Sequence, residues 1–130
     1  FESVALAGSM LGSGGVTVME EGTDMVWAAL RLMEFFYHES CGKCSPCREG
    51  SSWLVQIMRR IVNKRGQMAD LETLTDLCKN IAGRTVCAFG DAEVSPILST
   101  LKHWRHEYVA MIHAAEAANL IRPEPAGAKH

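Results

Sequence analysis

Three cysteines, Cys41, Cys44 and Cys47, stand with two residues between each pair, and a fourth, Cys87, follows far along the chain. Thiolates at this spacing can point at a common centre, so three of them can hold one face of an iron–sulfur cube that takes its last ligand from elsewhere. A two-cluster ferredoxin would have a further cysteine separated from the third by three residues, at the position where this chain has Ser51. The pattern therefore predicts one 4Fe-4S cluster with Cys87 as the distant ligand.

Zinc is the main alternative to an iron–sulfur cluster. Structural zinc usually takes two separated Cys-x-x-Cys pairs, or cysteines combined with histidines, whereas here the split is three plus one. A disulfide framework fits less well, because the chain has 5 cysteines, an odd number. Spacing alone leaves both alternatives open. The fifth cysteine, Cys78, falls on an apolar helical stripe and is expected to be a buried structural thiol.

Helices must bring the two groups of cysteines together. From Thr23 onward, apolar residues recur at helical spacing in four segments. The predicted helices span residues 24–37, 45–63, 71–81 and 95–115, and the expected N-caps of the first three are Thr23, Ser45 and Asp70. Four amphipathic helices with short connections are typical of an antiparallel bundle. The loops that carry Cys41 and Cys87 then meet at one end of it.

Residues 1–22 differ from this helical part. They are expected to contain a Gly-rich turn followed by a β-branched strand at Val16–Met19, whose partner strands lie outside this chain. The tail at 116–130, with prolines at positions 123 and 125, is expected to be disordered from Arg122 onward. The predicted fold is therefore mainly α: a small four-helix bundle at 23–115 that carries a 4Fe-4S cluster, preceded by a short β remnant.

The composition narrows the possible functions. A net charge of −2 gives no overall attraction for nucleic acid or an anionic membrane, and no stretch approaches the length of a membrane span. Trp53 and Trp104 fall at expected core positions, and His38 is expected to be a histidine that ends a helix. We find no arrangement of an activated nucleophile, so a redox or metal centre is the only chemistry predicted.

The run His38–Gly50, HESCGKCSPCREG, together with Cys87–Ala92, CAFGDA, closely resembles the NADH-binding flavoprotein subunit of bacterial NADH–quinone oxidoreductase, respiratory complex I. The stretch Leu11–Met19 resembles the end of that subunit's ubiquitin-like β-grasp domain. Diaphorase subunits of NAD-linked hydrogenases and formate dehydrogenases share the cysteine pattern. The continuation Arg48–Gly50 favours complex I.

This resemblance implies that Cys41, Cys44, Cys47 and Cys87 hold one 4Fe-4S cluster. It implies an electron-transfer module of an NADH dehydrogenase, which takes single electrons from reduced FMN and passes them to the next iron–sulfur subunit. The FMN and NADH sites are expected in an N-terminal part of the parent subunit that this chain does not contain.

The same resemblance implies partners and a location. The expected partners are the large iron–sulfur subunit and the small 2Fe-2S subunit of the peripheral arm, with no nucleic acid and no direct membrane insertion. The expected location is cytoplasmic, peripheral to the inner membrane through the complex. Two alternatives remain open: a diaphorase fragment of an NAD-linked hydrogenase or formate dehydrogenase, and a zinc-stabilised helical interaction module.

Overall fold

The structure, a computed structural model, describes residues 2–118, which contain six helices and no strand. The helices are α1 (Glu2–Leu6), α2 (Met25–Glu39), α3 (Ser45–Val62), α4 (Met68–Ile81), α5 (Phe89–His103) and α6 (Arg105–Ala117). The prediction of a mainly α fold is confirmed.

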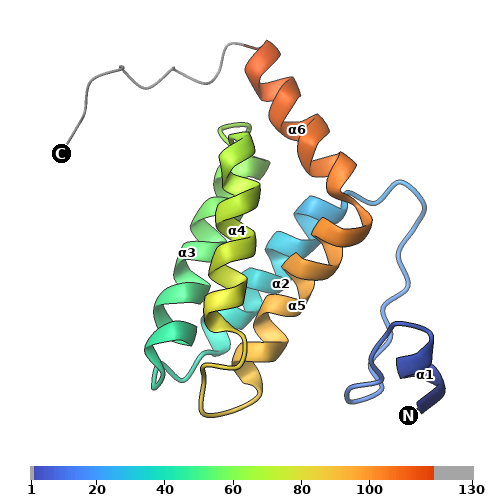
Figure 1. The fold of residues 1–130 in the computed structure, drawn as a ribbon. Helices are drawn as coiled ribbons and strands as arrows, with labels where there is room; N and C mark the ends of the chain where they lie inside the picture. Colours follow the sequence, from blue (N-terminus) through green and yellow to red (C-terminus); the bar gives the residue numbers. More distant parts are fainter. Residues whose placement is uncertain (1, 119–130) are drawn as a thin grey trace.

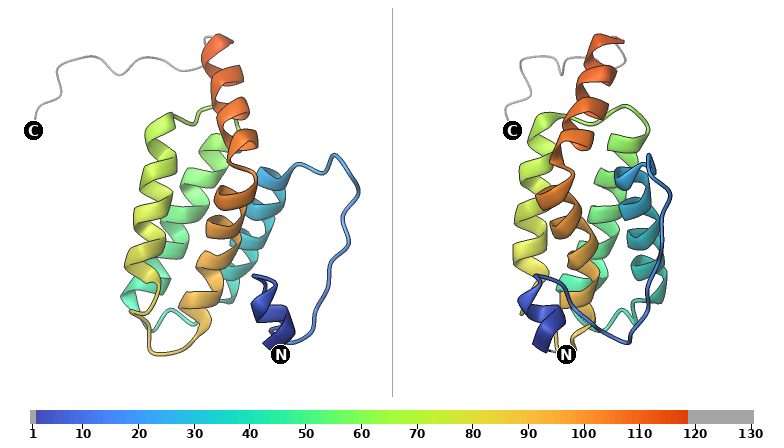
Figure 2. Two further views of the ribbon diagram at one scale, coloured as in Figure 1. Left: turned by 45° about the vertical axis from the view of Figure 1, so that its right-hand side comes forward. Right: turned by 90° about the vertical axis from the view of Figure 1, so that its right-hand side faces the viewer.

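Helices α2 to α5 run alternately up and down, and each packs against the next one along the chain (Figure 1). Helix α5 also packs against α2, so the four helices enclose a common interior. Figure 2 shows this arrangement from two further sides, with α6 continuing beyond the end of α5. The connections at 40–44 and 82–88 consequently lie at the same end of the packed helices.

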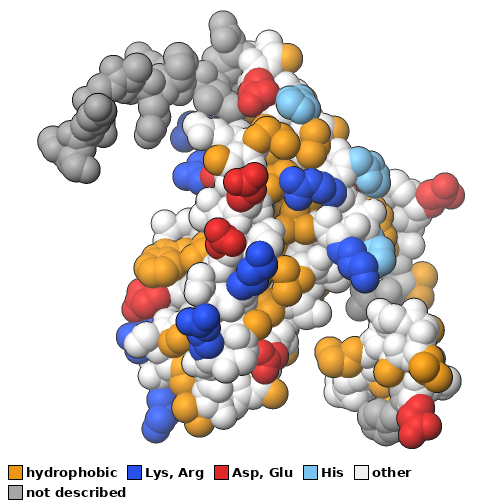
Figure 3. Space-filling view, viewed as in Figure 1, with side chains coloured by type: hydrophobic (Ala, Val, Ile, Leu, Met, Phe, Trp, Pro, Cys, Tyr) orange, Lys and Arg blue, Asp and Glu red, His pale blue; other side chains and the backbone are white. Residues whose placement is uncertain are grey.

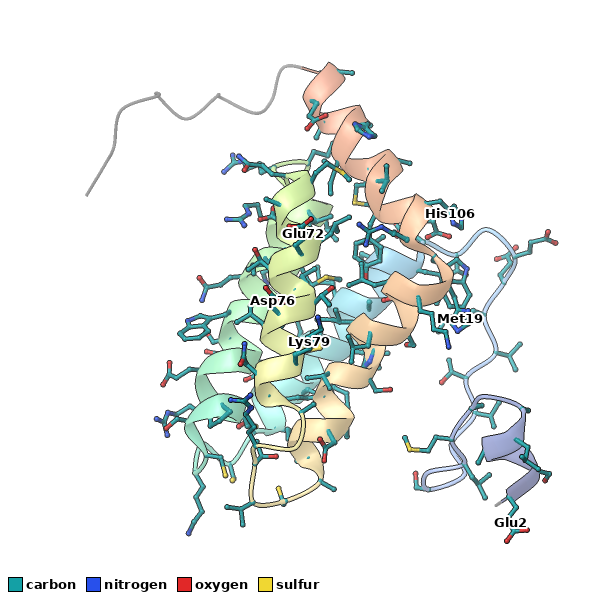
Figure 4. All side chains as sticks on the ribbon, in the orientation of Figure 1. Glu2, Met19, Glu72, Asp76, Lys79 and His106 are labelled. Carbon is teal, nitrogen blue, oxygen red and sulfur yellow. The ribbon has the colours of Figure 1, made fainter. Side chains whose placement is uncertain are left out.

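The core is built from the apolar stripes of these helices. Its fully buried members include Val26, Met33, Leu54, Met58, Ile61, Leu71, Leu74, Ile81, Ile97, Tyr108 and Ile112. Burial of each such aliphatic side chain contributes roughly 1.5–3 kcal/mol. Glu72, Asp76 and Lys79 lie along the exposed side of α4 (Figure 4), as expected for an amphipathic helix. Apolar side chains also reach the surface between charged ones (Figure 3).

Three residues that were predicted to lie in the core have different outcomes. Cys78 is fully buried, so its prediction as a structural thiol is confirmed. The core prediction for Trp53 is wrong, because its side chain is 51% exposed on α3. Trp53 immediately precedes the buried Leu54, and one residue corresponds to a rotation of about 100° around a helix. Trp104 is half-buried.

The helix ends differ from the predicted caps by one to three residues. Asp24, not Thr23, caps α2, because its Oδ1 accepts hydrogen bonds from the N–H groups of Val26 and Trp27 at 2.9 Å. Cys44 occupies the N-cap of α3. Asp70 lies inside α4, where its Oδ2 accepts from the backbone N–H of Gln67 at 2.8 Å and completes a capping box.

The last predicted helix is two helices. Helix α5 begins at Phe89 rather than Ser95, and Trp104, with a φ of −127°, separates it from α6. Pro96 suggested a helix start because proline is favoured in the first turn. In the structure Pro96 lies inside α5, and its carbonyl accepts a hydrogen bond from the Thr100 hydroxyl at 2.6 Å.

The N-terminal segment forms the predicted turn but not the predicted strand. The N–H of Gly14 donates to the carbonyl of Leu11 at 2.9 Å, whereas Val16 and Val18 are exposed and form no strand. A strand is not stable without a partner, and residues 2–118 offer none. The assignment of residues 1–22 to a β-grasp domain stays a prediction. The tail predicted from Arg122 lies outside the described residues.

Candidate metal centre

A cavity of about 170 Å³ lies between the 40–44 and 82–88 loops. All four predicted ligands line it: Cys41, Cys44, Cys47 and Cys87. Cys47 comes from the first turn of α3, and the other three come from the loops and the helix cap. Two segments far apart in the sequence thus place four thiols around one space. Within residues 2–118, no three His, Cys, Asp or Glu side chains are gathered as a single metal ion would require.

The four thiols differ in their surroundings. Cys41 and Cys87 are exposed, Cys44 is half-buried and Cys47 is buried. Cys47 Sγ donates to Glu93 Oε2 at 3.2 Å and lies 3.2 Å from Ser40 Oγ. Burial and the neighbouring Glu93 together raise the pKa of the Cys47 thiol to about 11, although the hydrogen bond with the Ser40 hydroxyl acts to lower it. Cys47 is therefore a protonated thiol in the cluster-free chain at neutral pH.

Glu93 is a site residue that the sequence reasoning missed. Its side chain is fully buried, and its Oε1 atom has no hydrogen-bond partner among the described residues. Burial raises the pKa of this carboxyl to about 7, and the hydrogen bond from Cys47 lowers it in part. The signal in the sequence is its place next to Val94 and four residues before Ile97, on the inward side of α5. A glutamate there breaks an otherwise apolar face.

The loop that carries Cys87 is fixed by residues at its two ends. Asp91 Oδ1 accepts a hydrogen bond from the N–H of Gly83 at 2.7 Å, and the Thr85 hydroxyl donates to the carbonyl of Cys87 at 2.8 Å. Thr85 packs so closely on Gly90 that a Cβ atom there would lie 2.3 Å from Thr85 Oγ1. These contacts hold Cys87 at the cavity.

The two loops also contact each other directly. The backbone N–H of Val86 points at Cys44 Sγ, with an N···S distance of 3.5 Å. The N-terminus of α3, which no side chain caps, brings partial positive charge to the same place, and Lys43 lines the cavity. Backbone donors and positive charge are what an anionic thiolate-bound cluster requires from its surroundings. The donor set and these donors fit a 4Fe-4S cluster.

Other features of the chain lie apart from this cavity. His38 is exposed and 3.2 Å from Glu39 Oε1, and it does not line the cavity. A larger hollow of about 670 Å³ lies between residues 19–25 and α6, and no cysteine lines it. No helix among the described residues is long and apolar enough to cross a membrane.

The sequence matches a known family over most of its length. Residues 27–111 match the NADH-ubiquinone oxidoreductase-F iron-sulfur binding region. An F-type subunit of NADH-quinone oxidoreductase from Rhizobium meliloti (strain 1021) is 54% identical over 112 residues, which are 86% of this chain and 27% of that protein. The F-type subunit of NADH-quinone oxidoreductase from Streptomyces coelicolor is 52% identical over 108 residues, covering 83% and 24% of the two chains. This chain spans about a quarter of the length of these relatives.

Solved structures share the fold. The NAD+-reducing [NiFe]-hydrogenase in its air-oxidized state has a TM-score of 0.70 and 26% identity, over 82% of this chain and 22% of that one. The H2-reduced state of such a hydrogenase gives the same TM-score at 24% identity, over 83% and 21% of the two chains. The match to the family covers the helices and loops that surround the four thiols. The chain belongs to the family of the NADH-ubiquinone oxidoreductase-F iron-sulfur binding region.

Proposed function

We propose that residues 23–115, in which α2 to α5 form a four-helix bundle extended by α6, hold one 4Fe-4S cluster through Cys41, Cys44, Cys47 and Cys87. The observation that carries this proposal is the single cavity lined by all four thiols. Membership of an iron-sulfur binding family supports it. When bound, such a cluster accepts and gives up single electrons.

The chain's own residues set the surroundings of the cluster. The N–H of Val86 and the N-terminus of α3 favour negative charge on the thiolates and therefore favour the reduced state. Phe89 and the buried Gly90 also line the cavity. The thiols of Cys41 and Cys87 are exposed, which would give electrons a short route to a docked partner.

The parent protein is, in this proposal, the flavoprotein subunit of an NADH–quinone oxidoreductase. The relatives at 52–54% identity are subunits of that enzyme by name. The chain would then relay single electrons from reduced FMN to the large iron–sulfur subunit, beside the small 2Fe-2S subunit. The FMN and NADH sites would lie in the rest of the parent subunit, on the cytoplasmic side of the membrane.

A second candidate is the diaphorase part of an NAD-linked hydrogenase. The fold shared with an NAD+-reducing [NiFe]-hydrogenase favours it, but the identity of 26% is about half that of the oxidoreductase relatives. The cluster chemistry is the same in both candidates, and only the partners differ. A zinc-stabilised module is the remaining alternative. Analysis of the protein for zinc, iron and sulfide distinguishes it from a cluster-binding module.

Anaerobic reconstitution with iron and sulfide tests the proposal. We expect iron and acid-labile sulfide in equal amounts, a broad visible absorption and a spin-resonance signal after reduction with dithionite. NADH without added flavoprotein should leave the absorption unchanged, because a hydride donor needs a flavin to deliver single electrons, and the sequence has no phosphate-binding glycine loop. A colourless protein with zinc and no sulfide would refute the cluster. Rapid bleaching by NADH would refute the relay.

A further inference from the structure

Both backbone polar groups of Gly42 form hydrogen bonds with side chains that are not cysteines. Its N–H donates to Ser40 Oγ at 3.3 Å, and its carbonyl accepts from Arg48 Nη1 at 2.6 Å. Gly42 has a φ of +74°, in the left-handed region that favours glycine. Because Gly42 stands between Cys41 and Cys44, these two hydrogen bonds fix the backbone that aims both thiols.

Arg48 is itself fixed by its neighbours. Its Nε donates to Glu49 Oε1 at 2.9 Å, and its Nη2 lies 3.5 Å from Ser45 Oγ. Its stem lies beside the loop, since a Cβ atom at Gly42 would be 3.8 Å from Arg48 Cδ. A guanidinium can serve a carbonyl, a carboxylate and a hydroxyl at once because its donors form a planar fork, whereas an ammonium is a compact point charge. The arrangement thus uses the shape of arginine as well as its charge.

We infer that Arg48 is a positioning residue for the metal centre, whose guanidinium holds the Gly42 carbonyl so that Cys41 and Cys44 face the cavity before iron binds. The inference rests on the proposed function for the identity of the ligands. Arg48 also places a fixed positive charge beside the loop. A cation near an iron–sulfur cluster favours its reduced, more negative form. Removal of Arg48 therefore affects both the order of the loop and the midpoint potential.

The first test uses the cluster-free chain and amide hydrogen exchange. We expect Arg48→Ala to speed exchange of the Gly42 amide, whose N–H donates to Ser40 Oγ, about tenfold, the effect of losing one charge-assisted hydrogen bond. Arg48→Lys keeps the charge but not the fork, so exchange should also be faster than in the parent. Arg59→Ala is the matched control, because Arg59 lies on the same helix and pairs with Glu34 at 2.9 Å. Its side chain is 54% exposed, against 47% for Arg48.

The second test uses the reconstituted chain. Iron release to a chelator should be about tenfold faster in Arg48→Ala than in the parent. The midpoint potential of Arg48→Ala should be lower, while Arg48→Lys should keep the parent potential and still release iron faster. Arg59→Ala should match the parent in both measurements. If Arg48 only stabilised the fold, there would be no reason for Arg48→Lys to keep the parent midpoint potential while releasing iron faster.

Parent-like exchange and iron release in both Arg48 variants would overturn the inference, as would equal effects in Arg59→Ala. If Arg48→Ala does not fold, the Arg48→Lys variant provides the test. Exchange and iron release at the parent rates in Arg48→Lys would show that the planar guanidinium is not required. Failure of the parent chain to take up iron and sulfide would refute the proposed function instead. In that case the exchange rates of the cluster-free chain would still decide whether Arg48 orders the loop.

Discussion

At the scale of single residues, the surroundings of the cysteines separate two kinds of thiol. Cys87 lines the cavity, whereas Cys78 is fully buried in the core and does not line it. We expect Cys87→Ser to lose most of the bound iron, because one of four ligands is removed. Cys78→Ser should keep its iron content but lose about 1–3 kcal/mol of unfolding free energy, because a hydroxyl is buried without a partner. Iron analysis and urea unfolding measure the two effects. Full iron in Cys87→Ser, with loss in Cys78→Ser, would reverse the assignment.

Glu93 gives the cluster-free chain a pH dependence. Burial raises the pKa of its carboxyl from 4.5 to about 7, so the folded chain holds this proton more tightly than the unfolded chain. The resulting stability is complete below pH 4.5 and is lost as the pH rises through 7, a loss that approaches about 3 kcal/mol. We expect Glu93→Gln to flatten this dependence in urea unfolding. The same slope in parent and variant would show that another group titrates there.

The cysteines and Glu93 also show what the sequence can reveal about a site. The spacing of Cys41, Cys44 and Cys47 identified them as candidate ligands, because cluster ligands that are close in sequence are separated by a characteristic two residues. Glu93 was missed because its burial depends on α5 beginning at Phe89 and on the packing of α5 against the other helices. Trp53 was misplaced for a similar reason, since a rotation of one residue around α3 separates surface from core. The burial of Glu93 and the exposure of Trp53 are set by how the helices pack, which the local sequence does not specify.

At the scale of the elements, the 82–88 loop depends on Gly90 at the start of α5. A Cβ atom at Gly90 would lie 2.3 Å from Oγ1 of Thr85, whose hydroxyl donates to the Cys87 carbonyl. We expect Gly90→Ala to displace the loop, cost about 1–3 kcal/mol of unfolding free energy and lower the iron content. Gly15→Ala is the control, because a Cβ atom there meets nothing within 4 Å. Equal stability and iron content in the two variants would show that the loop adapts freely.

The helices themselves were predictable to different degrees. Helix α3 was predicted at 45–63 and spans Ser45–Val62, because its apolar stripe is regular and Pro46 marks its start. The break at Trp104 was missed, since the apolar residues of α5 and α6 continue at helical spacing across it. The strand at Val16–Met19 was predicted from local β propensity, which cannot form a strand without a partner.

At the scale of the whole molecule, the cluster would join the two ends of a long stretch of chain. Cys47 lies in the first turn of α3 and Cys87 follows α4, so ligation cross-links the two ends of this helical pair, beyond the contact between the Val86 N–H and Cys44 Sγ. We expect the loaded chain to unfold several degrees higher than the cluster-free chain in thermal circular dichroism. The helical signal at low temperature should be similar in both, because the apolar core does not include the cavity. Coinciding thermal midpoints would contradict this coupling.

The unequal exposure of the thiols has a practical consequence for handling the protein. Cys41 and Cys87 are open to solvent, while Cys47 and Cys78 are enclosed. Oxygen and alkylating reagents therefore reach the two outer sulfurs first whenever the metal is missing. An aged preparation would keep its helices and sediment normally, yet it would no longer accept iron, because half of the ligands had become sulfinic acids or adducts. The capacity of a stored preparation to bind iron therefore depends on the chemical state of the Cys41 and Cys87 thiols. Peptide mass mapping would detect their oxidation or alkylation.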